Sequence, residues 1–334
     1  MRLFKSAAAP LLLTALGGCK MVVMDPAGDI AVQQRDLILL STVLMLLIIV
    51  PVIGMTLYFA WKYRASNTKA TYDPEWHHST RIEMVVWAIP MAIILVLGGV
   101  AWVTSHTLDP YRQLDRLGPN RPVPQGVKPL EVQVVALDWK WLFIYPDLGI
   151  ATVNELAAPV DRPIEFKITA SSVMNSFYVP ALAGQIYAMP GMQTQMHAVI
   201  NHRGVYDGLS ANYSGAGFSG MHFKFKGMSE PQFEQWVSSV RGAPGRLTHA
   251  DYLALAQPST DDPVRHFGGV DQGLFLDVVN RWAQTGKTCT HELPSTPGAH
   301  TAKDASPAMS MPMPVAAASE RLSKTPLASP RSAG

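Results

Sequence analysis

Residues 37–61 read LILLSTVLMLLIIVPVIGMTLYFAW, and residues 84–105 read MVVWAIPMAIILVLGGVAWVTS; neither stretch contains Asp, Glu, Lys or Arg. At about 1.5 Å of rise per residue, a helix of either length crosses a hydrocarbon core of about 30 Å. We therefore predict two transmembrane helices, over residues 37–61 and 84–106. Two buried helices of a soluble core are the alternative, and these lengths disfavour it.

The loop over residues 62–83 carries four basic side chains, those of Lys62, Arg64, Lys69 and Arg81. Short loops rich in Lys and Arg stay on the cytoplasmic side of a membrane. The chain after about Thr107 is then expected on the outer side. The formal net charge of the whole chain is only +2, with scattered basic residues, so we expect no nucleic-acid partner.

The N-terminus has the layout of an export signal. Arg2 and Lys5 precede an apolar stretch that ends in Leu16-Gly17-Gly18-Cys19. This resembles a bacterial lipoprotein signal, in which residues 1–18 are removed and Cys19 is lipidated. An ordinary signal peptide with an incidental Cys19 is the alternative. We expect a lipid-anchored protein of the bacterial inner membrane, with residues 19–36 and the soluble domain on the periplasmic side.

An exported β domain is predicted over residues 128–228, after a proline-rich linker over residues 107–127. Apolar and polar residues alternate over residues 130–135, 164–168 and 221–226. Short alternating stretches separated by turn residues are typical of a β-sandwich or Greek-key barrel. The aromatic run DWKWLFIY over residues 138–145 is interpreted as a core or subunit-interface cluster.

The remainder of the chain divides into a helical region and a tail. Ser229 followed by Pro231, and Thr248 further on, are typical of helix starts, so we predict helices within residues 229–290. Residues 291–334 are rich in Pro, Ala and Ser without a helix or strand period, which predicts a disordered tail.

Two segments of the β domain, MNSFYVP over residues 174–180 and YDGLSANYSGAGFSGM over residues 206–221, resemble subunit II of the haem–copper oxidases. The resemblance extends over about residues 30–230 and implies a cupredoxin-like Greek-key fold. In copper-bearing members, the first segment contains a His and the second reads Cys-x-Glu-x-Cys-x3-His-x2-Met. This chain has other residues at all of these positions except the last, namely Asn175, Ser210, Asn212, Ser214 and Phe218, with Met221 retained.

These replacements predict that the chain holds no metal, because a dinuclear copper centre needs bridging thiolates and imidazoles. The same replacements, together with residues 180–192, most resemble the cytochrome bo-type ubiquinol oxidase branch of the family. That resemblance implies that ubiquinol, haems and copper are bound by subunit I, which reduces oxygen to water and pumps protons. It also implies subunits I, III and IV and membrane lipid as partners.

Cytochrome c is not an expected partner, because residues 128–228 hold seven acidic and seven basic residues and thus no acidic excess to attract it. Two alternatives stay open: a menaquinol oxidase subunit II, and a copper-handling membrane lipoprotein with a cupredoxin-like domain.

The pattern Glu83-x-x-x-Trp87-x-x-Pro90 also occurs in the family. There the glutamate lies at the cytoplasmic mouth of a proton-uptake channel of subunit I, so the resemblance implies a proton-relay role for Glu83. The alternative is an acid that complements the dipole at a helix start, a stabilisation of about 0.3–1 kcal/mol.

Overall fold

The computed structural model describes residues 21–71, 73–281 and 283. The predicted signal peptide, Cys19 and the predicted tail over residues 291–334 lie outside the described residues, as do residues 284–290.

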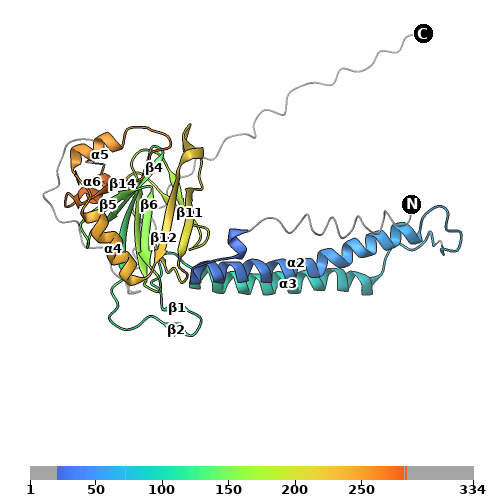
Figure 1. Ribbon diagram of the computed structural model, residues 1–334. Coiled ribbons are helices and arrows are strands. Elements are labelled where there is room, and N and C mark those ends of the chain that lie inside the picture. The colour runs from blue at the N-terminus through green and yellow to red at the C-terminus, as the bar shows by residue number, and fades with distance from the viewer. Residues whose placement is uncertain (1–20, 72, 282, 284–334) are drawn as a thin grey trace, which may run out of the picture. The chain divides into compact units, whose positions relative to one another are not determined.

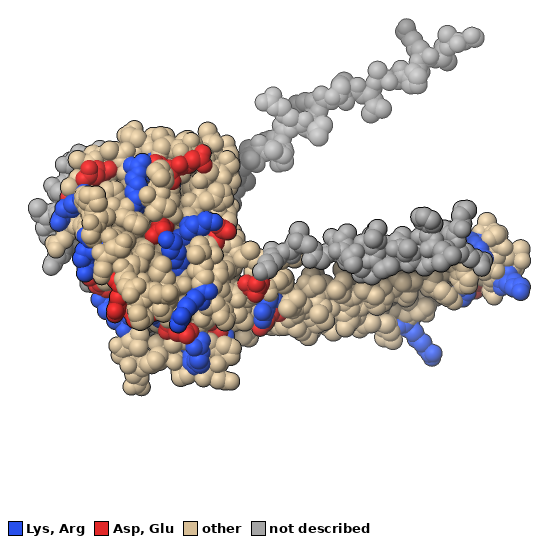
Figure 2. All heavy atoms as spheres, viewed as in Figure 1, with Lys and Arg blue, Asp and Glu red and all other residues tan. Residues whose placement is uncertain are grey.

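Two long apolar helices follow a short 3-10 turn, η1 (Val22–Met24), and lie side by side (Figure 1). The helices are α2 (Asp29–Lys62) and α3 (Thr80–Thr107), and both are long and apolar enough to cross a membrane. Figure 2 shows that most of their visible surface carries neither Lys, Arg, Asp nor Glu. Helix α2 begins eight residues before Leu37, so its first two turns, which contain both charged and apolar residues, extend past the uncharged stretch.

The β domain consists of two sheets packed face to face, which confirms the predicted cupredoxin-like fold. The larger sheet has the order β10 (Thr194–Ala198), β7 (Ile164–Ala170), β3 (Leu130–Leu137), β4 (Lys140–Tyr145), β5 (Ile150–Val153), β14 (Arg265–Phe267). The smaller has the order β6 (Glu155–Pro159), β12 (His222–Met228), β11 (Gly204–Ser210), β8 (Asn175–Tyr178), β9 (Ile186–Ala188). The β3–β7 and β12–β6 pairs are parallel, and the other pairs within these two sheets are antiparallel.

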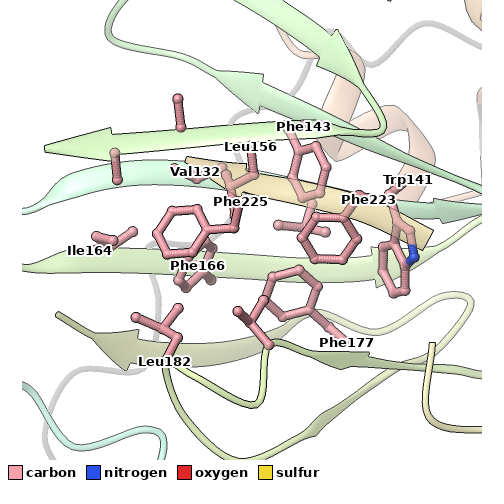
Figure 3. Packing of buried hydrophobic residues seen from close by; sticks show 14 of the residues in the cluster. Val132, Trp141, Phe143, Leu156, Ile164, Phe166, Phe177, Leu182, Phe223 and Phe225 are labelled. Atoms are coloured by element: carbon pink, nitrogen blue, oxygen red, sulfur yellow. The ribbon is translucent and has the colours of Figure 1, made fainter. Parts of the chain in front are cut away.

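Aromatic rings fill the space between the two sheets (Figure 3). Phe177 of β8 stacks on Phe223 of β12, with ring centroids 5.4 Å apart and planes within 9°. Trp141 of β4 meets both rings edge-on, at 5.5 and 5.7 Å. Offset and edge-to-face contacts of this kind add to the free energy of burial. The aromatic run is therefore part of the core.

Helices follow the sandwich, as predicted; those in the described part of the chain are α4 (Glu230–Arg241), α5 (His249–Leu255) and α6 (Leu274–Val279). Ser229 and Thr248 form capping boxes at the starts of α4 and α5. Helices α5 and α6 pack on the outer face of the larger sheet, where Leu142 and Ile144 point away from the first core and into a second one. Strand β4 is thus buried on both faces, which explains its continuous apolar sequence.

The expected linker over residues 107–127 contains a short hairpin formed by β1 (Arg116–Gly118) and β2 (Arg121–Pro122). Asn120 makes its turn possible, because its φ of 58° lies in the left-handed region that asparagine tolerates. A second two-stranded pair joins β13 (Arg246–Leu247) to β15 (Gly269–Val270).

Candidate functional site

The segments that resemble a copper site meet at one end of the smaller sheet. Strands β8 and β11 are antiparallel neighbours, with Ser210 opposite Phe177. The chain then runs through residues 211–217 into a 3-10 turn, η2 (Phe218–Gly220), and returns along β12. Sheet pairing therefore brings Asn175 next to Ser210, although they are 35 residues apart in the sequence.

Asn175 and Ser210 are bound directly to each other. The Ser210 hydroxyl lies 3.0 Å from the side-chain oxygen of Asn175 and 3.3 Å from the carbonyl oxygen of Asn212, so it can donate to either. The Asn212 amide donates to the Met174 carbonyl at 3.3 Å. Both Asn175 and Ser210 are buried. These side chains satisfy one another by hydrogen bonds inside the domain.

The other three positions differ in their surroundings. The Ser214 carbonyl accepts a hydrogen bond from the indole of Trp139 at 3.1 Å. Phe218 packs against Tyr213, with ring centroids 5.6 Å apart. Met221 is fully buried within the sandwich core, and its carbonyl accepts from the Ser210 amide at 3.2 Å.

The side-chain atoms that could bind a metal at these six positions are amide oxygens and nitrogens, hydroxyl oxygens and one thioether sulfur. Phe218 has no lone pair to offer. Across residues 21–71, 73–281 and 283, there is no group of three or more His, Cys, Asp or Glu side chains placed to hold a metal ion.

Glu83 lies in the first turn of α3, outside the β domain. Its Oε1 atom is 2.7 Å from Nδ1 of His78, and Nε2 of His78 is 3.1 Å from the Thr80 hydroxyl. The Glu83 and His78 side chains are 54% and 55% exposed. The acid and the imidazole thus form an open pair at one end of α3.

Lys140 is a buried residue of this region that sequence reasoning did not single out. Its ammonium group donates to the carbonyls of Leu255 and Gln257 at 2.9 and 2.8 Å and lies 3.1 Å from the Asp262 carboxylate. Its side chain is only 2% exposed. The sequence signal for a buried ion pair was the position of this lysine between two tryptophans of an apolar strand, because a buried charge needs buried partners.

Trp139, beside Lys140, lies between the loop over residues 211–217 and the C-terminal region. A Cβ atom on Gly217 would lie 2.4 Å from the Trp139 ring and 2.7 Å from Thr260. Only glycine leaves room for this close approach. The contacts of Lys140 and Trp139 hold residues 255–262 close to the loop over residues 211–217.

Two family models match the β domain and the C-terminal helical region. "Cytochrome C oxidase subunit II, periplasmic domain" matches residues 147–227, and "COX Aromatic Rich Motif" matches residues 241–286. The periplasmic domain of cytochrome oxidase subunit II from Bradyrhizobium japonicum, 22% identical, aligns over 35% of this chain and 95% of that domain with a TM-score of 0.33. The first of these models places the β domain in the class of oxidase subunit II.

Comparison with whole proteins narrows this class. Cytochrome bo(3) ubiquinol oxidase subunit 2 of Pseudomonas aeruginosa is 51% identical over 278 residues, which are 83% of this chain and 81% of that protein. Ubiquinol oxidase subunit 2 of Acetobacter aceti is 48% identical over 267 residues, 80% of this chain and 84% of that protein. The chain belongs to the ubiquinol oxidase subunit 2 family.

Proposed function

We propose that this chain is subunit II of a proton-pumping complex that oxidises ubiquinol and reduces oxygen to water. The names of its relatives support the substrate, and the two apolar helices support a place in the membrane. In this proposal, the complex lies in the bacterial inner membrane with the β domain on the periplasmic side. Subunit I binds the haems, copper and ubiquinol, and subunits III and IV complete the assembly.

The chain has no copper-based electron input in this proposal, and the observation that carries it is the hydrogen bond between Ser210 and Asn175. A dinuclear copper centre requires bridging thiolates, whereas serine hydroxyls stay protonated near neutral pH and are hard donors. Both side chains are already satisfied by protein partners. The residues at these positions therefore do not fit the metal, and the β domain serves structure and assembly.

Oxygen uptake by the purified complex tests the proposed substrate, ubiquinol, and the proposed absence of a copper-based electron input. Ubiquinol, menaquinol and reduced cytochrome c are offered separately, and copper is counted per haem before and after Ser210→Ala. We expect uptake with ubiquinol alone and an unchanged copper content. Faster uptake with menaquinol would favour a menaquinol oxidase. Uptake with cytochrome c, or copper lost with Ser210→Ala, would contradict the assignment, and copper binding without any uptake would favour a copper-handling lipoprotein.

Glu83 is proposed to contribute to proton uptake, together with His78. The exposed pair at 2.7 Å supports this role, because an imidazole beside a carboxylate can pass a proton to it. We expect Glu83→Ala to slow turnover and proton uptake together. Glu75→Ala, which removes an exposed acid of the loop before α3, is the matched control. Equal turnover in both variants would leave Glu83 only the role of stabilising the helix start.

Lipidation of Cys19 is proposed as a further attachment to the membrane. Residues 19–36 would then join the lipid to α2. Metabolic labelling with a radioactive fatty acid tests this directly, with Cys19→Ser as the variant and Cys289→Ser as the matched control. An unlabelled wild-type protein would point to the ordinary signal peptide instead, and label retained in Cys19→Ser would place the lipid on another residue.

A further inference from the structure

A cavity of about 240 Å³ lies where the outer ends of α2 and α3 meet the edge of the larger sheet. Its walls come from the first turns of α2, from the chain just after α3 and from strand β10. Gln34 lies three residues before the apolar stretch of α2, and Leu108 directly follows α3. A helix rises about 1.5 Å per residue, so the cavity lies within about one turn of the apolar spans. In the proposed topology, this is the level of the lipid headgroups.

His197 of β10 lines this cavity and is only 8% exposed. Its backbone amide donates to the Pro110 carbonyl at 3.0 Å, which holds the strand against the cavity wall. Within the described part of the chain, its imidazole has no hydrogen-bond partner. Burial lowers the pKa of His197, and the opposing effect of Glu165 across the strand pair is smaller. The ring is therefore neutral near pH 7 and presents an unused acceptor nitrogen.

The charged groups of the cavity leave a second unused acceptor. Asp29 is bound by Arg116 at 2.9 Å and by Gln33 at 2.8 Å, and Arg112 is paired with Asp115 at 2.8 Å. The remaining carboxylate, Asp109, accepts only the backbone amide of Tyr111, at 2.9 Å, among the residues described. Both arginines of the cavity thus have carboxylate partners, and the lining carries one negative charge in excess. A ligand that brings positive charge and N–H donors complements this lining.

We propose that the cavity binds the primary ammonium headgroup of a membrane phospholipid, of the phosphatidylethanolamine kind. The three N–H donors of the ammonium group supply what the Asp109 carboxylate and the His197 imidazole lack. The cavity volume equals that of about eight liquid waters, which is room for one headgroup. The acyl chains lie along the apolar surfaces of α2 and α3. This site is independent of the quinol chemistry proposed above.

Native mass spectrometry of the purified, delipidated complex tests the site. The complex is titrated with phosphatidylethanolamine and with phosphatidylcholine, whose trimethylated nitrogen has the same charge but no N–H donor. We expect Asp109→Asn and His197→Leu each to raise the Kd of the tightest phosphatidylethanolamine site about tenfold or more. Binding of phosphatidylcholine should be unchanged. Asp207→Asn and His202→Leu remove an exposed carboxylate and an exposed imidazole of the same domain, and serve as matched controls.

Three results would overturn the proposal. The first is that wild type and both variants bind phosphatidylethanolamine equally well, and the second is that the variants lose phosphatidylcholine binding to the same extent. The third is that the purified complex retains ubiquinone in this cavity in place of the lipid. Asp109 is exposed and outside the core, so Asp109→Asn keeps the test valid if His197→Leu fails to assemble. Oxygen uptake with ubiquinol is measured on the same samples. Its persistence in Asp109→Asn would separate loss of the lipid site from loss of the oxidase.

Discussion

Nε of Arg116 lies 2.9 Å from Oδ2 of Asp29, and this ion pair joins the start of α2 to the chain that follows α3. The Asp29 side chain is 1% exposed, and Arg116 and Gln33 supply its side-chain hydrogen bonds. The preceding residue, Gly28, packs directly against the backbone of the β domain, because a Cβ atom there would lie 2.5 Å from the Val199 carbonyl oxygen. The start of α2 is thereby held against the β domain and against the chain that follows α3.

Replacing Arg116 by methionine keeps the length of the side chain and removes its charge. The buried Asp29 carboxylate then lacks its cation, and we expect a loss of about 3 kcal/mol in the stability of this junction. Thermal unfolding of the purified complex measures the change. Arg121→Met removes an exposed arginine that pairs with Asp161, and is expected to cost less stability, because water screens an exposed ion pair. Equal unfolding temperatures for the two variants would show that the Asp29 pair does not hold the junction.

Lys140→Met is expected to release the segment that carries Asp262. The substitution leaves two backbone carbonyls without their buried donor, and it leaves the Asp262 carboxylate, which is 7% exposed, with Arg265 at 2.6 Å as its remaining cation. We expect a loss of about 1–3 kcal/mol, because the two buried carbonyls lose their donor while Asp262 keeps its pair with Arg265. Hydrogen exchange measured by mass spectrometry should show faster exchange in residues 255–262. Lys128→Met, which removes an exposed lysine paired with Asp147, should leave this exchange unchanged.

Glu155 is expected to make the attachment of the C-terminal region sensitive to acid. Burial alone would raise its pKa, but hydrogen bonds from Lys226 and Trp236 outweigh burial and hold the pKa below the ordinary 4.5. A lowered carboxyl pKa contributes stability that is present above the ordinary value and is lost as the pH falls through the folded value. Stability should therefore decrease below about pH 4.5.

The variant Glu155→Gln tests this pH dependence. It should lower stability at pH 7, because Lys226 loses its buried anion, and should flatten the decrease below pH 4.5. Denaturant unfolding of the complex at pH 7 and at pH 4 provides the comparison. Glu131→Gln removes a partly exposed acid paired with Lys167, and serves as the control. An acid-induced decrease as large in Glu155→Gln as in wild type would assign that decrease to other carboxylates.

Gly217→Ala is expected to displace Trp139. The added methyl group would meet the indole ring at 2.4 Å, and the hydrogen bond from Trp139 to the Ser214 carbonyl would be lost. Overpacking of this kind costs about 1–3 kcal/mol. Tryptophan fluorescence measures the displacement. If Gly217→Ala changes the fluorescence of the wild type but not that of a Trp139→Phe protein, the change comes from Trp139. Gly242→Ala is the control, because its added carbon would meet neighbours only at 3.5 Å.

The sequence by itself determined the elements whose signals are local. Two uncharged stretches of 25 and 22 residues predicted α2 and α3, because a helix in lipid satisfies its own backbone hydrogen bonds. Ser229 and Thr248 marked the starts of α4 and α5, because a cap acts within one turn. Alternation predicted strands with one solvated face, but could not show that both faces of β4 are buried, which requires the helices that cover it.

Only the tertiary structure decided the contacts that give these elements their roles. Ser210 meets Asn175 because β11 pairs with β8 in one register, and Lys140 meets Asp262 because the C-terminal region folds back over the larger sheet. His197 and Asp109 lie 88 residues apart and line one cavity only because β10 forms the edge of that sheet. Sheet register and helix packing depend on contacts between distant residues, which no local period or motif encodes.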